Sequence, residues 1–289
     1  STKIGFIKSQ SIIARETSMA DSTLNAVVSQ KIEVSPGLII LRVVPDGWVL
    51  PDYKAGQFTV LGLPGTAPRH LFSDGEEALG TPENLIKRAY SISSASRNKE
   101  YIEFYITMVR SGALTPRIFA LETGSRIFLS QKFTGVFTLE MTGSESNIVL
   151  LGTGTGLAPY MSMLREDLPC NSNRKYIIVH GARHSWDLGY RSELNTIANV
   201  CNNFTYIPAI TRPELEHIPW GGQSGYIQDL WKNGIIQTKS GLEPTPDNTH
   251  IFLCGNPSMI DIMVKLLESD GFKEHSKKSP GQIHLERYW

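Results

Sequence analysis

Cysteine is scarce in this chain, and the few thiols lie far apart. Three cysteines occur among the 289 residues, at positions 170, 201 and 254. An odd and widely spaced set supplies neither a disulfide framework nor the four thiolates of a zinc or iron–sulfur site. We therefore expect no metal centre, and a reducing compartment, the cytoplasm, with an organelle matrix or stroma as the alternative.

Net charge and long apolar runs are absent too. The 28 basic residues balance the 28 acidic ones, which removes whole-molecule attraction to nucleic acid as a basis for function. No run approaches the roughly 20 apolar residues that cross a bilayer, so we expect no transmembrane span. Residues 1–24 contain no compact apolar core of a secretion signal, and we treat them as an N-terminal extension of unassigned role.

What remains divides into two halves with different patterning. From 25 to 142, short β-rich runs are separated by turn residues, which predicts an antiparallel barrel or sandwich with one helix over 115–121. From 143 to 289, strands alternate with helices, which predicts a parallel sheet covered on both faces. The predicted strands span 148–151, 176–180, 204–210 and 251–254, and the predicted helices 160–167, 189–199, 227–232 and 258–269. Ligands of such sheets bind at the carboxyl ends of the strands.

The stretch "GTGTGLAP", Gly152 to Pro159, follows the first predicted strand of the second half and opens a helix. Glycines let a backbone approach a ligand closely, and amides at a helix start favour phosphate oxygens. The stretch is no P-loop, and Leu157 stands where a strict GxGxxG motif has its third glycine. A phosphate cradle is the prediction, and a glycine turn without a ligand is the alternative.

The ends of the next strands indicate which dinucleotide would bind. An NAD site places a carboxylate there, whereas a 2′-phosphate calls for arginine. "VHGAR" supplies Arg183 and no acid, "ITRPE" supplies Thr211 and Arg212, and "SGYIQDL" supplies Tyr226 for stacking on adenine. The prediction is NADP(H), although each arginine taken alone is an ordinary surface residue.

Four motifs in order carry a family resemblance. "RAYSISS" (88–94) is an extended segment with charge, ring and hydroxyl in register, and it is followed by "GTGTGLAP", "FLCGNPSM" (252–259) and the C-terminal "HLERYW". The sequence resembles the ferredoxin–NADP(+) reductase family of flavoproteins over roughly 25–289. The resemblance implies an antiparallel β-barrel domain for FAD (25–142) and a Rossmann-like α/β domain for NADP (143–289), whose aromatic tail returns to the flavin.

The resemblance also implies where FAD binds. Arg88 would hold a pyrophosphate oxygen, Tyr90 would cover one flavin face, and Ser91 would bond near flavin N5. "SGALTPR" (111–117) is similar to the family's second phosphate segment. The expected FAD residues are Arg88, Ala89, Tyr90, Ser91, Gly112, Ala113, Leu114, Thr115, Thr155, Tyr288 and Trp289.

For the nicotinamide, the resemblance implies that Ser91, Cys254 and Glu286 align the ring while Tyr288 moves aside. A buried structural thiol is the alternative for Cys254. The expected NADP residues are Gly152, Thr153, Gly154, Thr155, Gly156, Pro159, Arg183, Arg191, Thr211, Arg212, Tyr226, Gln228, Cys254, Gly255, Asn256, Pro257 and Met259. Many bacterial members have arginine where Tyr226 stands, and "YIQ" is similar to the plastid form. The acidic insertion 71–87 has no assigned role.

The implied function is a monomeric FAD-dependent oxidoreductase that transfers hydride between NADP(H) and flavin N5 and single electrons to or from ferredoxin or flavodoxin. Both carriers are usually acidic, and five basic residues could form a docking face: Lys54, Arg69, Lys87, Arg97 and Lys132. Two alternatives stay open. One is an NADH–cytochrome b5 or ferric reductase on the same fold, and the other is a binding module without turnover.

Overall fold

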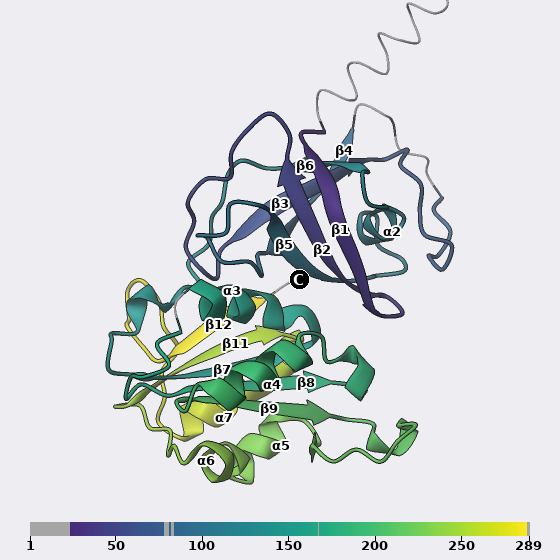
Figure 1. The fold of residues 1–289 in the computed structure, drawn as a ribbon. Helices are drawn as coiled ribbons and strands as arrows, with labels where there is room; N and C mark the ends of the chain where they lie inside the picture. Colours follow the sequence, from purple (N-terminus) through teal and green to yellow (C-terminus); the bar gives the residue numbers. More distant parts are fainter. Residues whose placement is uncertain (1–23, 78–80, 82–83, 167, 288–289) are drawn as a thin grey trace, which may run out of the picture. The chain divides into compact units, whose positions relative to one another are not determined.

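The computed structural model describes residues 24–77, 81, 84–166 and 168–287, which form two compact units (Figure 1). The first unit contains 24–33, Gly37–Tyr53 and Phe58–Thr134, and the second contains Val34–Pro36, Lys54–Gln57 and the chain from Gly135 onward. No helix among the described residues has the length and apolar character needed to cross a membrane.

The first unit is an antiparallel sheet of six strands closed on itself. The strands stand in the order β4-β3-β6-β1-β2-β5. Their bounds are Ala26–Ser35 for β1, Leu38–Pro45 for β2, Phe58–Pro64 for β3, Leu85–Ser91 for β4, Ile102–Thr107 for β5 and Arg126–Leu129 for β6. An antiparallel bridge between Ile92 and Phe104 joins the two ends of the sheet, so the predicted barrel is confirmed.

The barrel interior explains why these segments are strands. Leu41, Ile102 and Phe104 are fully buried in one apolar cluster with Leu61 and Leu129 from the facing strands. β-branched and aromatic side chains at such positions pack well on a pleated surface. The predicted helix is present as the short α2, Thr115–Phe119.

The second unit is a parallel sheet in the order β10-β9-β8-β7-β11-β12, with helices on both faces (Figure 1). The strands are β7 (Asn147–Thr153), β8 (Tyr176–Ala182), β9 (Phe204–Ile210), β10 (Gln223–Ser224), β11 (Thr249–Gly255) and β12 (Ile283–Arg287). The helices are α3 (Ala158–Glu166), α4 (Arg191–Val200), α5 (Ile227–Lys232), α6 (Ile235–Ser240) and α7 (Pro257–Ser269). The predicted α/β architecture is confirmed.

The cysteine expectation is wrong for two of the three residues. Cys170, in the loop after α3, and Cys201, at the end of α4, form a disulfide. The two cysteines are 31 residues apart in sequence, and the sequence alone does not show that α3 and α4 end at the same side of the sheet. Cys254 is fully buried and is not part of a disulfide.

Candidate functional site

Each of the three glycines in the turn after β7 meets a different structural requirement. Gly154 has φ of +54°, in the left-handed region that favours glycine. A Cβ on Gly156 would lie 2.3 Å from the carbonyl oxygen of Cys254, and one on Gly152 would lie 2.9 Å from the Tyr160 ring. The turn is thus free of side chains where it faces β11, and Pro159 sits in the first turn of α3 as expected.

The Cys-Gly motif at the end of β11 is bonded directly to this turn. The N–H of Asn256 donates to Thr153 Oγ1 at 2.8 Å. Gly255 has φ of +123°, and a Cβ there would lie 2.3 Å from the same oxygen. The Asn256 carboxamide accepts from Ser258 N and Met259 N and so caps α7, with Pro257 in its first turn. Two motifs about a hundred residues apart therefore form one surface at the carboxyl edge of the sheet.

His180, on the neighbouring strand β8, bonds to the glycine turn, and the sequence analysis did not predict this role. The side chain is fully buried on β8, with Nε2 3.3 Å from the carbonyl oxygen of Gly154 and Nδ1 3.4 Å from Tyr206 Oη. Because a carbonyl oxygen only accepts, Nε2 carries the proton. Burial lowers the pKa of His180 to about 4, so the ring is neutral at physiological pH.

Cys254 and Glu286 are direct neighbours across two parallel strands. They are register partners on β11 and β12, and the Cys254 thiol donates to Glu286 Oε2 at 3.8 Å. The predicted pair therefore comes together in the second unit. Tyr288 and Trp289 lie outside the described residues.

The loops after β8 and β9 are fastened to each other at the same edge. Arg212 N donates to Arg183 O and Thr211 N to Ala182 O, each at 3.1 Å. Glu216 accepts from both the N–H and the hydroxyl of Ser185, at 2.8 and 2.6 Å. The backbones of Arg183 and Arg212 are therefore adjacent, and both side chains are exposed.

Three further predicted residues frame this edge. Tyr226 exposes 60% of its surface, enough for a stacking partner. Gln228 presents a buried Oε1 with no hydrogen-bond partner among the described residues. The Arg191 guanidinium lies 4.7 Å from the Trp220 ring centroid, so its charge is held at the start of α4.

The barrel contributes its own polar edge along β4. Arg88 and Ala89 are exposed, whereas Tyr90 is half-buried and contacts Phe104 edge-on at 6.5 Å between ring centroids. Burial raises the pKa of the Tyr90 phenol, which stays protonated. Ser91 is buried at the end of the strand. The order of charge, ring and hydroxyl expected from the sequence is present along one strand.

The predicted diphosphate segment is a tight turn before α2. Gly112 N donates to Val109 O at 2.8 Å, and the Thr115 hydroxyl accepts from Val109 N and donates to Val109 O. That hydroxyl closes the turn. Among the described residues, the N–H groups of Ala113 and Leu114 donate to no acceptor.

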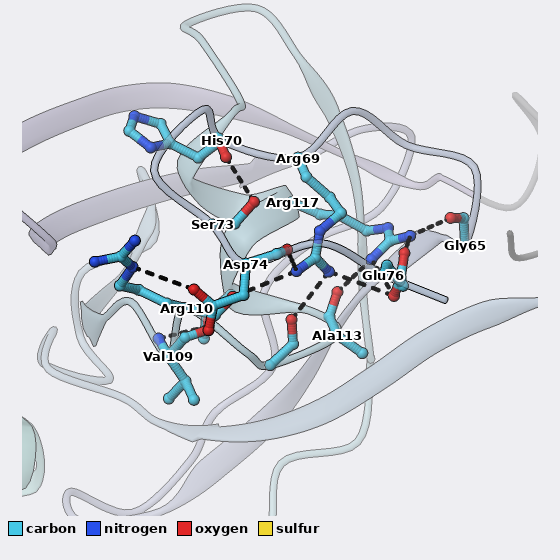
Figure 2. A network of polar contacts seen from close by, with 12 residues as sticks. Gly65, Arg69, His70, Ser73, Asp74, Glu76, Val109, Arg110, Ala113 and Arg117 are labelled. Carbon is cyan, nitrogen blue, oxygen red and sulfur yellow. Dashed lines mark hydrogen bonds and ion pairs between the residues drawn. The ribbon is translucent and has the colours of Figure 1, made fainter. Parts of the chain in front are cut away.

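An ionic network that includes the buried Arg117 lies next to this turn and was not predicted (Figure 2). Arg117 is 2% exposed and donates to Glu76 Oε2 at 2.6 Å, to Ala113 O at 2.6 Å and to Gly65 O. Arg69 donates to Gly112 O at 3.1 Å and to Glu76 Oε1 at 3.3 Å. The only sequence signal was the acidic character of the insertion that carries Glu76.

These residues fit the two expected cofactors on structural grounds. The unpaired amides of Ala113 and Leu114 suit a diphosphate in the barrel unit. The open turn at Gly154 and the unpaired acceptor of Gln228 suit a dinucleotide in the sheet unit. No group of three or more histidine, cysteine or carboxylate side chains that could hold a metal ion occurs among the described residues.

Comparison with known proteins supports this assignment. Residues 150–265 match the family model for the oxidoreductase NAD-binding domain. A flavodoxin/ferredoxin–NADP reductase from Buchnera aphidicola subsp. Baizongia pistaciae is 31% identical over 241 residues, covering 83% of this chain and 89% of the relative. The protein of that name from Escherichia coli K12 is 30% identical with the same coverage.

A solved structure is similar over nearly the whole chain. It is a ferredoxin NADP+ reductase from Neisseria gonorrhoeae with bound FAD and NADP, with a TM-score of 0.76 and 25% identity. The alignment covers 92% of this chain and 98% of that one. Both units therefore have counterparts of known fold.

Proposed function

The chain belongs to the flavodoxin/ferredoxin–NADP reductase family, and from that membership we propose an FAD-dependent oxidoreductase that exchanges hydride with NADP(H) and single electrons with ferredoxin or flavodoxin. FAD supplies the conversion between a hydride and two separate electrons. The protein supplies binding, orientation and electrostatics.

The observation that carries the proposal is the bonded edge of the sheet unit. Thr153 of the glycine turn accepts from Asn256 of the Cys-Gly motif, and Gly156 approaches the backbone of Cys254 with no room for a side chain. A site built this way presents backbone amides to phosphate oxygens. The Cys254 thiol and the Glu286 carboxylate stand on the adjacent strand ends.

We assign roles on that basis. Thr153, Gly154, Thr155 and Gly156 bind the NADP diphosphate. Arg183, Thr211, Arg212 and Tyr226 bind the 2′-phosphorylated adenosine, with Arg191 and Gln228 beside it. Cys254, Gly255, Asn256, Pro257 and Met259 border the nicotinamide end, where Cys254, Glu286, Ser91 and the C-terminal Tyr288 align the ring. Arg88, Ala89, Tyr90, Ser91, Gly112, Ala113, Leu114 and Thr115 hold FAD, with Thr155 and Trp289 as further contacts.

The adenosine assignment predicts a preference for NADPH. We expect kcat/KM to be higher for NADPH than for NADH, and Arg212→Ala to lower it about tenfold or more for NADPH while NADH changes little. Lys265→Ala removes one exposed positive charge from α7 and serves as the matched control. A preference for NADH would refute the NADP assignment and favour the NADH–cytochrome b5 reductase alternative.

The carrier is proposed to dock by charge. Lys87, Arg97 and Lys132 are exposed on the barrel unit and can face an acidic protein. Two other residues expected there are left out: Arg69 is 15% exposed and engaged in the network of Figure 2, and Lys54 belongs to the second unit and pairs with Glu140 at 2.7 Å. Reduction of ferredoxin or flavodoxin should slow with rising salt while reduction of a neutral dye does not. Equal salt dependence of the two would contradict docking by charge.

We further propose a monomer acting in the cytoplasm. Cytoplasmic glutathione and thioredoxin keep most thiols reduced, so the redox state of Cys170 and Cys201 in cells tests the compartment. Quantifying free thiols in protein alkylated directly in cells tests the compartment. Sizing the purified protein in solution tests the monomer. Complete oxidation in cells would argue for an oxidising compartment, and a stable dimer would contradict the monomer.

A further inference from the structure

Asp74 and Glu76, in the first part of the acidic insertion between β3 and β4, lie next to the turn that we assign to the FAD diphosphate. We propose that Glu76 is a positioning residue for FAD: through Arg69 and Arg117 it fixes the carbonyl groups of the turn so that the opposite amides face the diphosphate. The inference rests on the proposed function, since it takes the ligand of this turn to be FAD.

Glu76 is the carboxylate that joins two guanidinium groups whose other acceptors are backbone carbonyls (Figure 2). Its Oε2 accepts from Arg117 Nη2 at 2.6 Å, and its Oε1 accepts from Arg117 Nη1 at 3.2 Å and from Arg69 Nη1 at 3.3 Å. Asp74 pairs instead with Arg110, at 3.5 Å. Glu76 is therefore the carboxylate that sets the position of both arginines.

Each arginine then holds one carbonyl of the turn. Arg69 Nη1 donates to Gly112 O at 3.1 Å, and Arg117 Nη1 donates to Ala113 O at 2.6 Å. Successive carbonyls are thus drawn to the arginine side of the chain. An arginine fork fixes its partners in direction as well as distance.

Because the peptide bond is planar, holding these carbonyl groups also fixes the direction of the amide N–H groups that follow them. In a trans peptide the C=O and the following N–H point in opposite directions, and no described peptide here is cis. The N–H of Ala113 therefore points away from Arg69, and the N–H of Leu114 points away from Arg117. Leu114 is 2% exposed and its N–H has no acceptor among the described residues, a costly arrangement that a ligand oxygen would relieve.

Charge and position predict opposite results when Glu76 loses its negative charge. If Glu76 acted on FAD through charge alone, removing it would leave the positive charge of the two nearby arginines uncompensated and would tighten binding of the anionic diphosphate. If Glu76 acts by position, its removal releases Arg69 and Arg117 from their carbonyls and weakens binding. The sign of the change separates the two.

The experiment compares Glu76→Gln with Glu77→Gln in the full-length chain. Both substitutions remove one negative charge from adjacent exposed residues, but only Glu76 bonds to Arg69 and Arg117. Each variant is titrated with FAD and with riboflavin, which lacks the diphosphate. We expect Glu76→Gln to raise the FAD Kd about tenfold and to leave the riboflavin Kd within twofold, with Glu77→Gln unchanged for both.

A purely structural role for Glu76 would weaken both flavins alike, and this result would overturn the inference. Unchanged or tighter FAD binding by Glu76→Gln would also overturn it. Should Glu76→Gln fail to fold, Arg69→Lys decides, because it keeps the charge but loses the fork, and the same FAD-specific weakening is expected. Failure of the parent chain to bind any flavin would instead refute the proposed function.

Discussion

His180 shows how much of a phosphate-binding turn depends on a side chain outside it. Its Nε2 donates to the carbonyl of Gly154, the residue whose left-handed φ forms the turn. Burial keeps the ring neutral by lowering its pKa to about 4, so Nδ1 can accept from Tyr206 Oη while Nε2 donates to Gly154 O. Protonation would charge the buried ring, so the turn should be sensitive to acid.

The sign of this effect follows from linkage. An unfolded histidine titrates near pH 6.5, whereas folded His180 titrates near 4, so the unfolded state binds more protons between these values. Stability is present above about pH 6.5 and is lost as the pH falls toward 4, by about 2–3 kcal/mol at pH 4.5.

Urea unfolding at pH 7.5 and 4.5 measures this loss. His180→Gln should show a smaller difference between the two pH values than the parent, even if its stability at pH 7.5 is lower. His284, whose pKa burial lowers to about 3, contributes in the same direction in both proteins and cancels in the comparison. The same pH dependence in parent and variant would contradict the role of His180.

At the residue scale, the sequence predicts site residues that belong to a local motif. The three glycines, Thr153 and Asn256 were assigned to the dinucleotide site from spacing and resemblance. The roles of His180 and Glu76 were missed, because each side chain bonds to a residue that only the fold brings close. Gly154 is 26 residues from His180, and Arg117 is 41 residues from Glu76. Neither spacing belongs to a local pattern.

At the scale of elements, the glycine turn and β11 are packed backbone to backbone. A Cβ on Gly156 would lie 2.3 Å from Cys254 O, and β11 is held on both sides by β7 and β12, so it cannot retreat. Gly154 has open space around it, and alanine there meets only backbone strain.

These two glycines therefore predict different costs. Gly156→Ala should lower the free energy of unfolding by about 3 kcal/mol, in the upper part of the range for overpacking. Gly154→Ala should cost about 1 kcal/mol, the penalty for the left-handed conformation. Urea midpoints of the two variants give the comparison, and equal losses would show that β11 yields to the extra carbon.

The disulfide ties the ends of α3 and α4, the two helices that begin beside the assigned dinucleotide site. It closes a loop of 31 residues, which corresponds to about 3–4 kcal/mol of stabilisation through the unfolded state. The Asn203 carboxamide donates to Pro169 O at 2.7 Å and to Arg174 O at 2.8 Å in the same region, and these contacts do not depend on the disulfide.

Thermal melts with and without reductant test this. The parent should melt at a lower temperature in dithiothreitol, and Cys170→Ser should melt at that lower temperature whether or not reductant is present. A parent melt unaffected by reductant would mean that the two thiols are not joined in solution.

Element prediction was accurate for the central strands of the sheet and missed some of the short elements. β7, β8, β9 and β11 have buried apolar cores and were predicted within a few residues. β12 was not predicted, because its five residues become a strand only by pairing with β11, register to register. α6, of six residues, was also missed, whereas α5, of the same length, was predicted at 227–232.

At the scale of the whole molecule, the change from β runs to strand–helix alternation was enough to predict two kinds of domain. The resemblance then linked them to two cofactors, and the family membership agrees with it. The sequence could not show that the acidic insertion contributes to the barrel's ligand turn, because this depends on where residues 65–76 return in space.

Anaerobic rapid mixing of the FAD-loaded protein with NADPH tests the central claim most directly. The account predicts that the blue absorption band of the flavin bleaches within the mixing experiment, faster with NADPH than with NADH, and that adding oxidised ferredoxin or flavodoxin restores it. A protein that stays colourless after incubation with FAD, or whose bound flavin does not bleach with NADPH, would contradict it.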